Sequence, residues 1–469
     1  MPIVALIVLL AGVVWGAIYA RRGSLVVGAA GLIVVAYALG YYFWSLHVGP
    51  LPLTLDRIVL VGLCAAFVLQ WRGGQLEPKP LCGADWLLLL LLGILGVSLL
   101  TAGRPEVVAP DSFSPIWRLV MSFVVPAVLY WIARDARLSP RAWQMSLAIL
   151  AGLGVYLALT AIAEVAGLWS LVFPRYISDP TLGIHFGRAR GPELNSASLG
   201  VYLTICLWCA WCLRPEVRRS WQLVLLGAVP LMAVGILATY TRSTWIGLIA
   251  SAALVGFLQL HKSWRLPVFG LAGLCGLLVL AVMWQNVIDL KREGTAEESG
   301  HSVDQRTSFA YVSWNMFKDH PIFGVGFGRF YDQKLPYLSD RSQDFELESI
   351  RPLHHHNTLL SFLTEMGLIG LAAFVALVAA WARAAWSLVS DAALPRWQRS
   401  QGLLMLAVLV TYLSSAVFHD LTLLPSQQWI LFLAAGVTLN VRLATLPRAA
   451  NSGAPIPCAV PTPAAAISH

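Results

Sequence analysis

Three histidines and an asparagine stand together where a long polar segment meets an apolar one. The run from His354 through His355 and His356 to Asn357 is followed by an apolar stretch that reaches Leu371. Asparagine is a good N-cap residue, so we expect a helix to begin directly after it. A histidine at such a boundary, with a pKa near neutrality, suits a general base. His356 is closest to the helix start, and we predict that it is the base, with His355 and Asn357 supporting it.

A metal site is the alternative interpretation of these histidines. Consecutive residues on a regular element cannot direct three rings to one ion, and metal sites normally recruit ligands from elsewhere in the chain. Cys206, Cys209 and Cys212 form a CxxCxxC run, which in a soluble protein would suggest an iron–sulfur cluster. This run lies inside an apolar segment without a fourth cysteine nearby, so we interpret it as small packing residues. We predict neither a metal nor a cofactor.

Arginines at the ends of apolar segments are the next candidates. Arg242 lies between two apolar stretches with almost no loop around it. Such an arginine either snorkels to the membrane interface or faces a polar cavity or an anion. A guanidinium group matches the geometry of phosphate oxygens and never loses its charge. We therefore predict that Arg242 binds a phosphate.

Two further arginines, Arg188 and Arg190, precede a helix that we expect to begin at or just after Asn195. Cations beside a helix N-terminus, which itself favours anions, are typical of a pyrophosphate-binding site. A structural salt bridge with Glu193 or Asp179 is the alternative for this pair of arginines.

Two residues of opposite charge complete the candidate site. Glu365 lies two turns inside the helix that follows Asn357, and a carboxylate at that depth must be paired or functional. We predict that Glu365 partners an arginine. Arg306, on the long polar segment, is predicted to be a supporting cation.

The same polar segment contains the run GVGFG at residues 324–328. Its glycines resemble those of a nucleotide-binding loop, but no strand precedes them, so we do not expect a nucleotide. We expect a turn that packs Phe323, Phe327 and Phe330 on the membrane surface.

The elements that must position these residues are membrane helices. Of the 469 residues, 58% are hydrophobic and only 12% are charged. This balance indicates an all-α polytopic membrane protein, with twelve or thirteen transmembrane helices. The apolar segments are 3–20, 24–46, 51–71, 85–101, 116–133, 143–166, 196–213, 221–240, 243–260, 266–285, 358–382, 402–418 and 428–445.

Basic residues predict the orientation of these helices. Lys and Arg gather in alternate short loops, which places those loops in the cytoplasm and accounts for the net charge of +8 without nucleic acid. We expect a transmembrane bundle over 1–285 with a periplasmic loop at 168–195, and a large, partly helical periplasmic loop at 286–356. C-terminal transmembrane helices over 357–446 and a disordered cytoplasmic tail at 447–469 complete the prediction.

Taken together, these motifs resemble the O-antigen ligase and polymerase superfamily of bacterial envelopes. The likeness is carried by GRARGPELNSAS, TRSTWIGL, HPIFGVGFGRF and HHHNTLLSFLTEMGLIGL, between about residues 187 and 371. It implies a metal-independent GT-C-type glycosyltransferase of the bacterial inner membrane, with its active site on the periplasmic side. It matches His356 to the family's loop histidine and Arg190 and Arg242 to its essential arginines, with Arg188 as a competitor for the first.

An O-antigen ligase would transfer a glycan from undecaprenyl pyrophosphate to a sugar hydroxyl of the lipid A–core oligosaccharide, both in contact with membrane lipid. Arginines can neutralise the departing pyrophosphate and a histidine can deprotonate the acceptor, so we expect a single inverting displacement. The alternatives are an O-antigen polymerase or another transferase of lipid-linked glycans, and a transporter. A transporter would carry charges deep in several spans and internal symmetry, and the sequence shows little of either.

Overall fold

The computed structural model describes residues 16, 19–48, 51–76, 78–103, 114–268, 270, 296–340, 342 and 346–446. Within these ranges, seven helices are long and apolar enough to cross a membrane. The protein is a helical multi-pass membrane protein, as the sequence predicted. The predicted tail at 447–469 and most of the segments at 3–20 and 266–285 lie outside the described residues, so the total of twelve or thirteen spans stays a prediction.

The N-terminal part departs from the all-helical expectation. Helix α2 (Leu25–Ala38) is followed by an antiparallel hairpin of β1 (Ser45–Val48) and β2 (Leu51–Thr54), before α3 begins (Leu55–Arg72). The predicted apolar segments 24–46 and 51–71 are therefore part strand, and the prediction of continuous helix was wrong here. The Gly-Pro pair at positions 49 and 50 is a turn signal that outweighs the apolar composition around it.

The middle of the chain forms a helical bundle around α8. Nearly every residue of α8 is buried, and its neighbours are α7, α9, α10 and α16. Close approach depends on small residues: a Cβ added at Gly200 would lie 2.5 Å from the Thr244 side chain. The thiols of Cys206, Cys209 and Cys212 lie free and buried in the same helix. The helices of this region are α4 (Gly83–Thr101), α5 (Pro115–Leu119), the π turn η1 (Val120–Val124), α6 (Val125–Asp135), α7 (Pro140–Val165), α8 (Ser196–Leu213), α9 (Arg219–Ala238) and α10 (Arg242–Gln259).

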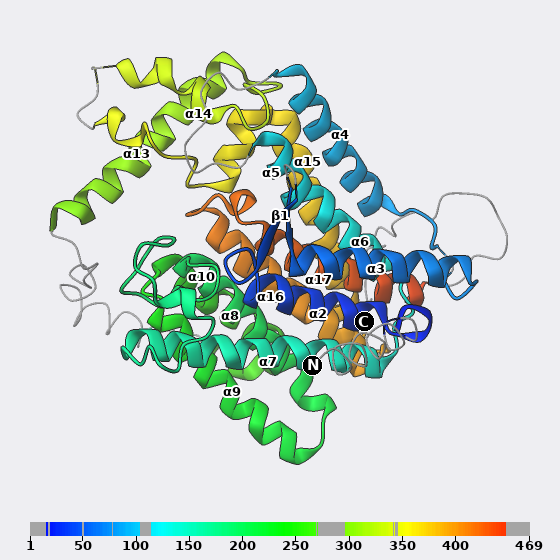
Figure 1. The fold of residues 1–469 in the computed structure, drawn as a ribbon. Coiled ribbons are helices and arrows are strands. Elements are labelled where there is room, and N and C mark those ends of the chain that lie inside the picture. Colours follow the sequence, from blue (N-terminus) through cyan, green and yellow to red (C-terminus); the bar gives the residue numbers. More distant parts are fainter. Residues whose placement is uncertain are drawn as a thin grey trace, which may run out of the picture.

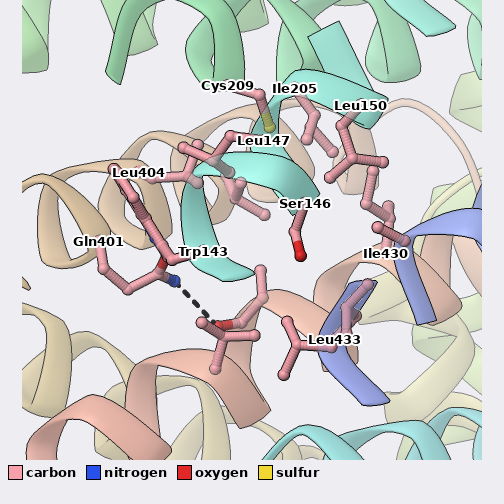
Figure 2. A pocket seen from close by; sticks show the side chains of 15 residues that line it. Trp143, Ser146, Leu147, Leu150, Ile205, Cys209, Gln401, Leu404, Ile430 and Leu433 are labelled. Atoms are coloured by element: carbon pink, nitrogen blue, oxygen red, sulfur yellow. Dashed lines mark hydrogen bonds between the residues drawn. The ribbon is translucent and has the colours of Figure 1, made fainter. Parts of the chain in front are cut away.

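The bundle interior contains a small apolar cavity of about 40 Å³ (Figure 2). Helices α2, α7 and α8 line it together with the C-terminal helices α16 (Arg396–Ala416) and α17 (Pro425–Thr445). Trp143 and Gln401 lie side by side at one end, where the indole N–H donates to the amide oxygen over 2.7 Å. A space of this size holds about one water molecule, so it is a packing defect and not a substrate site.

The polar segment before residue 356 is partly helical and lies against the start of α15 (Thr358–Ser390), as Figure 1 shows. It forms its own small apolar core, which includes Phe309, Val312 and Phe330. Its elements are α13 (Ala296–Asp319), α14 (Phe330–Gln333), η4 (Leu335–Ser339) and η5 (Leu347–Ile350).

Helix α15 is interrupted at Gly367, where the backbone takes φ 62° and ψ −161°. The amide groups of Leu368 and Ile369, which lose their helical acceptors at this break, donate instead to Pro321 O (2.9 Å) and Ile322 O (3.3 Å). In the opposite direction, the Val325 N–H donates to the Thr364 carbonyl in the first half of α15. The break in α15 and the segment 321–328 therefore satisfy each other's backbone hydrogen bonds.

The glycines of GVGFG do form turns, but the expected packing was wrong in one respect. Phe327 and Phe330 are buried inside the protein, whereas Phe323 is 72% exposed. The reason is the docking of this loop into the break of α15: a Cβ at Gly324 would lie 2.4 Å from the carbonyl carbon of Glu365. The loop faces the helix, and only its tip is free to meet solvent or lipid.

Candidate functional site

His355 is the most buried of the three histidines. Its ring stacks on Phe330 with 3.5 Å between centroids, and its Nε2 lies 2.7 Å from Thr364 Oγ1. The Thr364 hydroxyl already donates to the Leu360 carbonyl at 2.8 Å, so the histidine N–H is the donor to Thr364. Burial, followed by the charge of Arg118, lowers the pKa of His355 well below its usual value. His355 is therefore neutral and fixed in place.

His356 differs from its neighbour because its side chain is exposed. Its ring contacts the edge of Phe309 on α13, with 5.0 Å between centroids. The surrounding protein desolvates the part of the ring that faces inward and lowers the pKa of His356, and Arg306 lowers it further. An exposed imidazole that remains neutral at physiological pH can accept a proton from a hydroxyl.

A buried lysine fixes the loop that carries the histidines. Lys334 is completely buried, and its ammonium group donates to the carbonyls of Ile350 (2.7 Å) and Leu353. Burial lowers the pKa of Lys334 to about 7, and the nearby Arg351 adds to this effect. Burial and the charges of Arg118 and Lys334 also lower the pKa of His354 to about 4. The sequence analysis missed Lys334, because nothing in a single lysine of a polar loop signals burial.

Three helix N-termini meet beside His356 through the side chains of Ser196, Thr241, Ser243, Thr358 and His419, which we call the rim junction. At the start of α10, Thr241 Oγ1 donates to Ser196 Oγ of α8 over 3.0 Å. Ser243 Oγ, two residues later in the same turn, lies 3.0 Å from His419 Nε2. Thr358 Oγ1, at the start of α15, donates to the His419 carbonyl over 2.9 Å. The positive ends of α8, α10 and α15 therefore lie close together.

Capping differs among these three helices. Asn195 accepts from the amides of Ala197 and Ser198 at the start of α8, and Asn357 accepts from two amides at the start of α15. Both helix starts agree with the predictions. Thr241, the N-cap of α10, makes no side-chain capping bond with any residue that the structure describes. At the start of α10 the Thr244 amide instead donates to the backbone carbonyl of Thr241 over 3.1 Å.

Arg242 is exposed at this first turn of α10, between the two residues that join the rim junction. Arg306 lies on the other side of the junction, with its guanidinium carbon 5.6 Å from the centroid of the Phe418 ring. Burial lowers the pKa of His419 to about 3, and His356, His185 and Arg306 contribute, as expected if these groups are neighbours. The fold therefore gathers His356, Arg242 and Arg306 around one polar junction.

Arg190 has a different environment, buried within the loop between α7 and α8. Its guanidinium donates to the carbonyls of Leu182 (2.5 Å), Ile177 (2.8 Å) and Asp179 (2.6 Å). Its backbone N–H donates to the Glu164 carboxylate. Arg190 thus holds this loop together by binding backbone oxygens. Arg188 is half-buried in the same loop, three residues after His185. His185 Nδ1 lies 2.8 Å from Ser196 Oγ of the rim junction.

Glu365 is paired with an arginine that the sequence analysis did not select. Arg118 of α5 binds Glu365 at 2.8 Å and Asp420 at 3.2 Å, and all three side chains are buried. The same guanidinium donates to Ser361 (3.0 Å) and Thr422. The prediction of an arginine partner for Glu365 is confirmed. Arg118 could have been found from the signal that singled out Arg242, since it too lies at the edge of an apolar segment.

Among the residues that the structure describes, no group of three or more His, Cys, Asp or Glu side chains is placed to hold a metal ion. The comparison with curated proteins found no match to this chain. The profile of a family described as O-antigen ligase matches residues 227–375, which include α10, the GVGFG loop, His356 and the break in α15. The match covers the part of the chain that carries most of the candidate site. This part of the chain is therefore similar to the O-antigen ligase family.

Proposed function

We propose that this protein transfers an O-antigen glycan from undecaprenyl pyrophosphate to a hydroxyl group of the lipid A–core oligosaccharide, on the periplasmic face of the bacterial inner membrane. The match of residues 227–375 to the O-antigen ligase family supports lipid-linked glycan substrates. The observation that carries the finer proposal is the rim junction, where the exposed His356 and Arg242 flank the N-terminus of α10.

In this proposal the diphosphate lies at the first turn of α10. Amides at a helix N-terminus and a guanidinium group are both suited to phosphate oxygens. Arg242 supplies the nearest exposed guanidinium, and Arg306 adds charge from α13. Arg190 acts on the same site indirectly, because its loop carries Arg188 and His185 to the rim junction.

The reaction is one displacement at the anomeric carbon. The acceptor oxygen forms the new glycosidic bond while the bond between that carbon and the pyrophosphate oxygen breaks. The electron pair leaves with undecaprenyl pyrophosphate, whose developing charge the arginines and helix amides stabilise. The proton of the acceptor hydroxyl passes to His356. Direct attack inverts the configuration at the anomeric carbon.

Reconstituted protein with lipid-linked O-antigen and lipid A–core tests this proposal. We expect wild type to produce glycosylated lipid A–core with inverted anomeric configuration by NMR, and His356→Ala to abolish the product. His320→Ala, which alters an exposed histidine of the same polar segment, is the matched control and should retain activity. Retention of configuration, or full activity of His356→Ala, would refute the mechanism.

A cell-based gel separates the ligase from the polymerase. If the protein is a ligase, cells with His356→Ala lose long-chain lipopolysaccharide while lipid-linked polymer accumulates. Loss of the polymer itself would identify an O-antigen polymerase instead. The family match is compatible with both, so this gel is decisive between them.

A further inference from the structure

A polar hollow lies on the large loop, away from the rim junction. It is about 430 Å³ in volume and lies between the C-terminal half of α13 and η4. Small-molecule sites commonly measure some 300 to 1,000 Å³, so one or two sugar rings fit such a space. The side chains that define it are Tyr311, Asn315, Lys318, Asp319, Tyr337 and Asp340.

Two tyrosine–aspartate pairs are built into the wall of this hollow. Tyr337 donates to Asp319 over 2.6 Å, and Tyr311 donates to Asp340 over 2.5 Å. Each tyrosine oxygen can still accept a hydrogen bond, and each carboxylate has further lone pairs for hydroxyl donors. The Tyr311 bond also holds the pKa of Asp340 at about 2, so this carboxylate is ionised at physiological pH.

The charge of the hollow argues against a second phosphate site. Two carboxylates face it and Lys318 is the one cation among its lining residues, all of which the structure describes. Aromatic rings beside carboxylate and amide groups instead suit a ligand with apolar faces and many hydroxyl groups, which is the character of a sugar ring.

The position of the hollow relative to His356 fits this chemistry. Phe309 contacts His356, and Asn315 lies six residues farther along the same helix. At about 1.5 Å per residue this is roughly 9 Å along α13. A glycan whose reacting end lies at His356 can therefore place a later sugar in the hollow without leaving the surface of the protein.

We propose that this hollow is a carbohydrate subsite that binds a sugar ring of a glycan whose reacting end lies at the rim junction. The inference rests on the proposed glycan transfer, but binding can be measured without transfer. The glycan is either the donor chain or the acceptor core, and both present the same hydroxyl chemistry to the hollow.

Saturation-transfer NMR on the full chain in nanodiscs tests the subsite with two probes. One is a lipid-free oligosaccharide of one or two O-antigen repeats, and the other is the lipid-free core oligosaccharide. We expect a saturation-transfer signal from the wild-type protein to at least one of the two oligosaccharides. Asp319→Asn, which weakens a hydroxyl acceptor, and Ser339→Trp, which fills the hollow from its exposed rim, should each weaken binding about tenfold or more. The probe that responds identifies the glycan as donor or acceptor.

Two controls separate this inference from the transfer reaction. Glu346→Gln removes an exposed carboxylate of the same loop outside the hollow and should bind like wild type. His356→Ala should lose transfer yet still bind the oligosaccharide. Wild-type protein that binds neither probe, or hollow variants that bind as tightly as wild type, would overturn the subsite. Failure of transfer with intact binding would instead count against the proposed function alone.

Discussion

Replacing Gly367 by alanine tests the interdependence of α15 and the GVGFG loop. The backbone angles at Gly367 are essentially restricted to glycine, and holding another residue there costs about 1 to 3 kcal/mol. The new Cβ would also lie 2.3 Å from the Ile322 oxygen. Relief of this clash displaces the segment that accepts from Leu368 and Ile369, two bonds worth about 1 kcal/mol each. The expected destabilisation is therefore about 3 to 5 kcal/mol.

Thermal unfolding of the purified variant, with hydrogen exchange of residues 321–328, measures this effect. Gly367→Ala should unfold several degrees below wild type and exchange these amides faster. Gly96→Ala is the matched control, because a Cβ at Gly96 of α4 meets no described atom within 4 Å. Alanine is favoured in a helix by up to about 1 kcal/mol, so the control should be neutral or slightly stabilising. If Gly367→Ala unfolded at the wild-type temperature and exchanged the amides of residues 321–328 at the wild-type rate, the reasoning would be refuted.

Four other substitutions address the charged groups of the site. Arg118→Met leaves two buried carboxylates uncompensated and should lower the free energy of unfolding by about 3 to 5 kcal/mol. Glu365→Gln keeps the ion pair between Arg118 and Asp420 and should lower it by less. Equal effects of the two substitutions in denaturation experiments would contradict this order. Arg306→Gln should raise the pKa of His356 toward its ordinary value. Since the base must be neutral, the acid limb of the kcat/KM profile should move to higher pH, and an unmoved limb would exclude this coupling. Arg190→Gln should lower the apparent Tm, because three carbonyls lose a charged donor; an unchanged Tm would show that this guanidinium does not hold its loop.

Local sequence signals predicted the helix starts of the site well. The caps Asn195 and Asn357 occupy the positions that their side-chain chemistry favours, and the apolar segments after them are helical. The arginine partner of Glu365 also followed from a local argument, since a buried carboxylate needs a compensating charge.

Features that depend on distant parts of the chain were not predictable in this way. The pairing of Arg118 with Glu365 joins residues 247 positions apart, and the rim junction joins the starts of three separate helices. The break at Gly367 was also missed, because its unpaired amides are satisfied only by a loop some forty-five residues earlier in sequence. Apolar composition gave no warning of the β1–β2 hairpin, since strands and membrane helices draw on the same residue types.

The interlocked backbone at Gly367 also bears on how two lipid substrates would enter in the proposed transfer reaction. Residues 321–328 form backbone hydrogen bonds with both halves of α15, so this segment cannot move away from α15 without breaking those bonds. Any pivot of the extramembrane part must therefore lie elsewhere along the chain. In the proposed reaction, lipid tails that remain in the bilayer would therefore have to approach His356 laterally, between helices, while residues 321–328 stay in place.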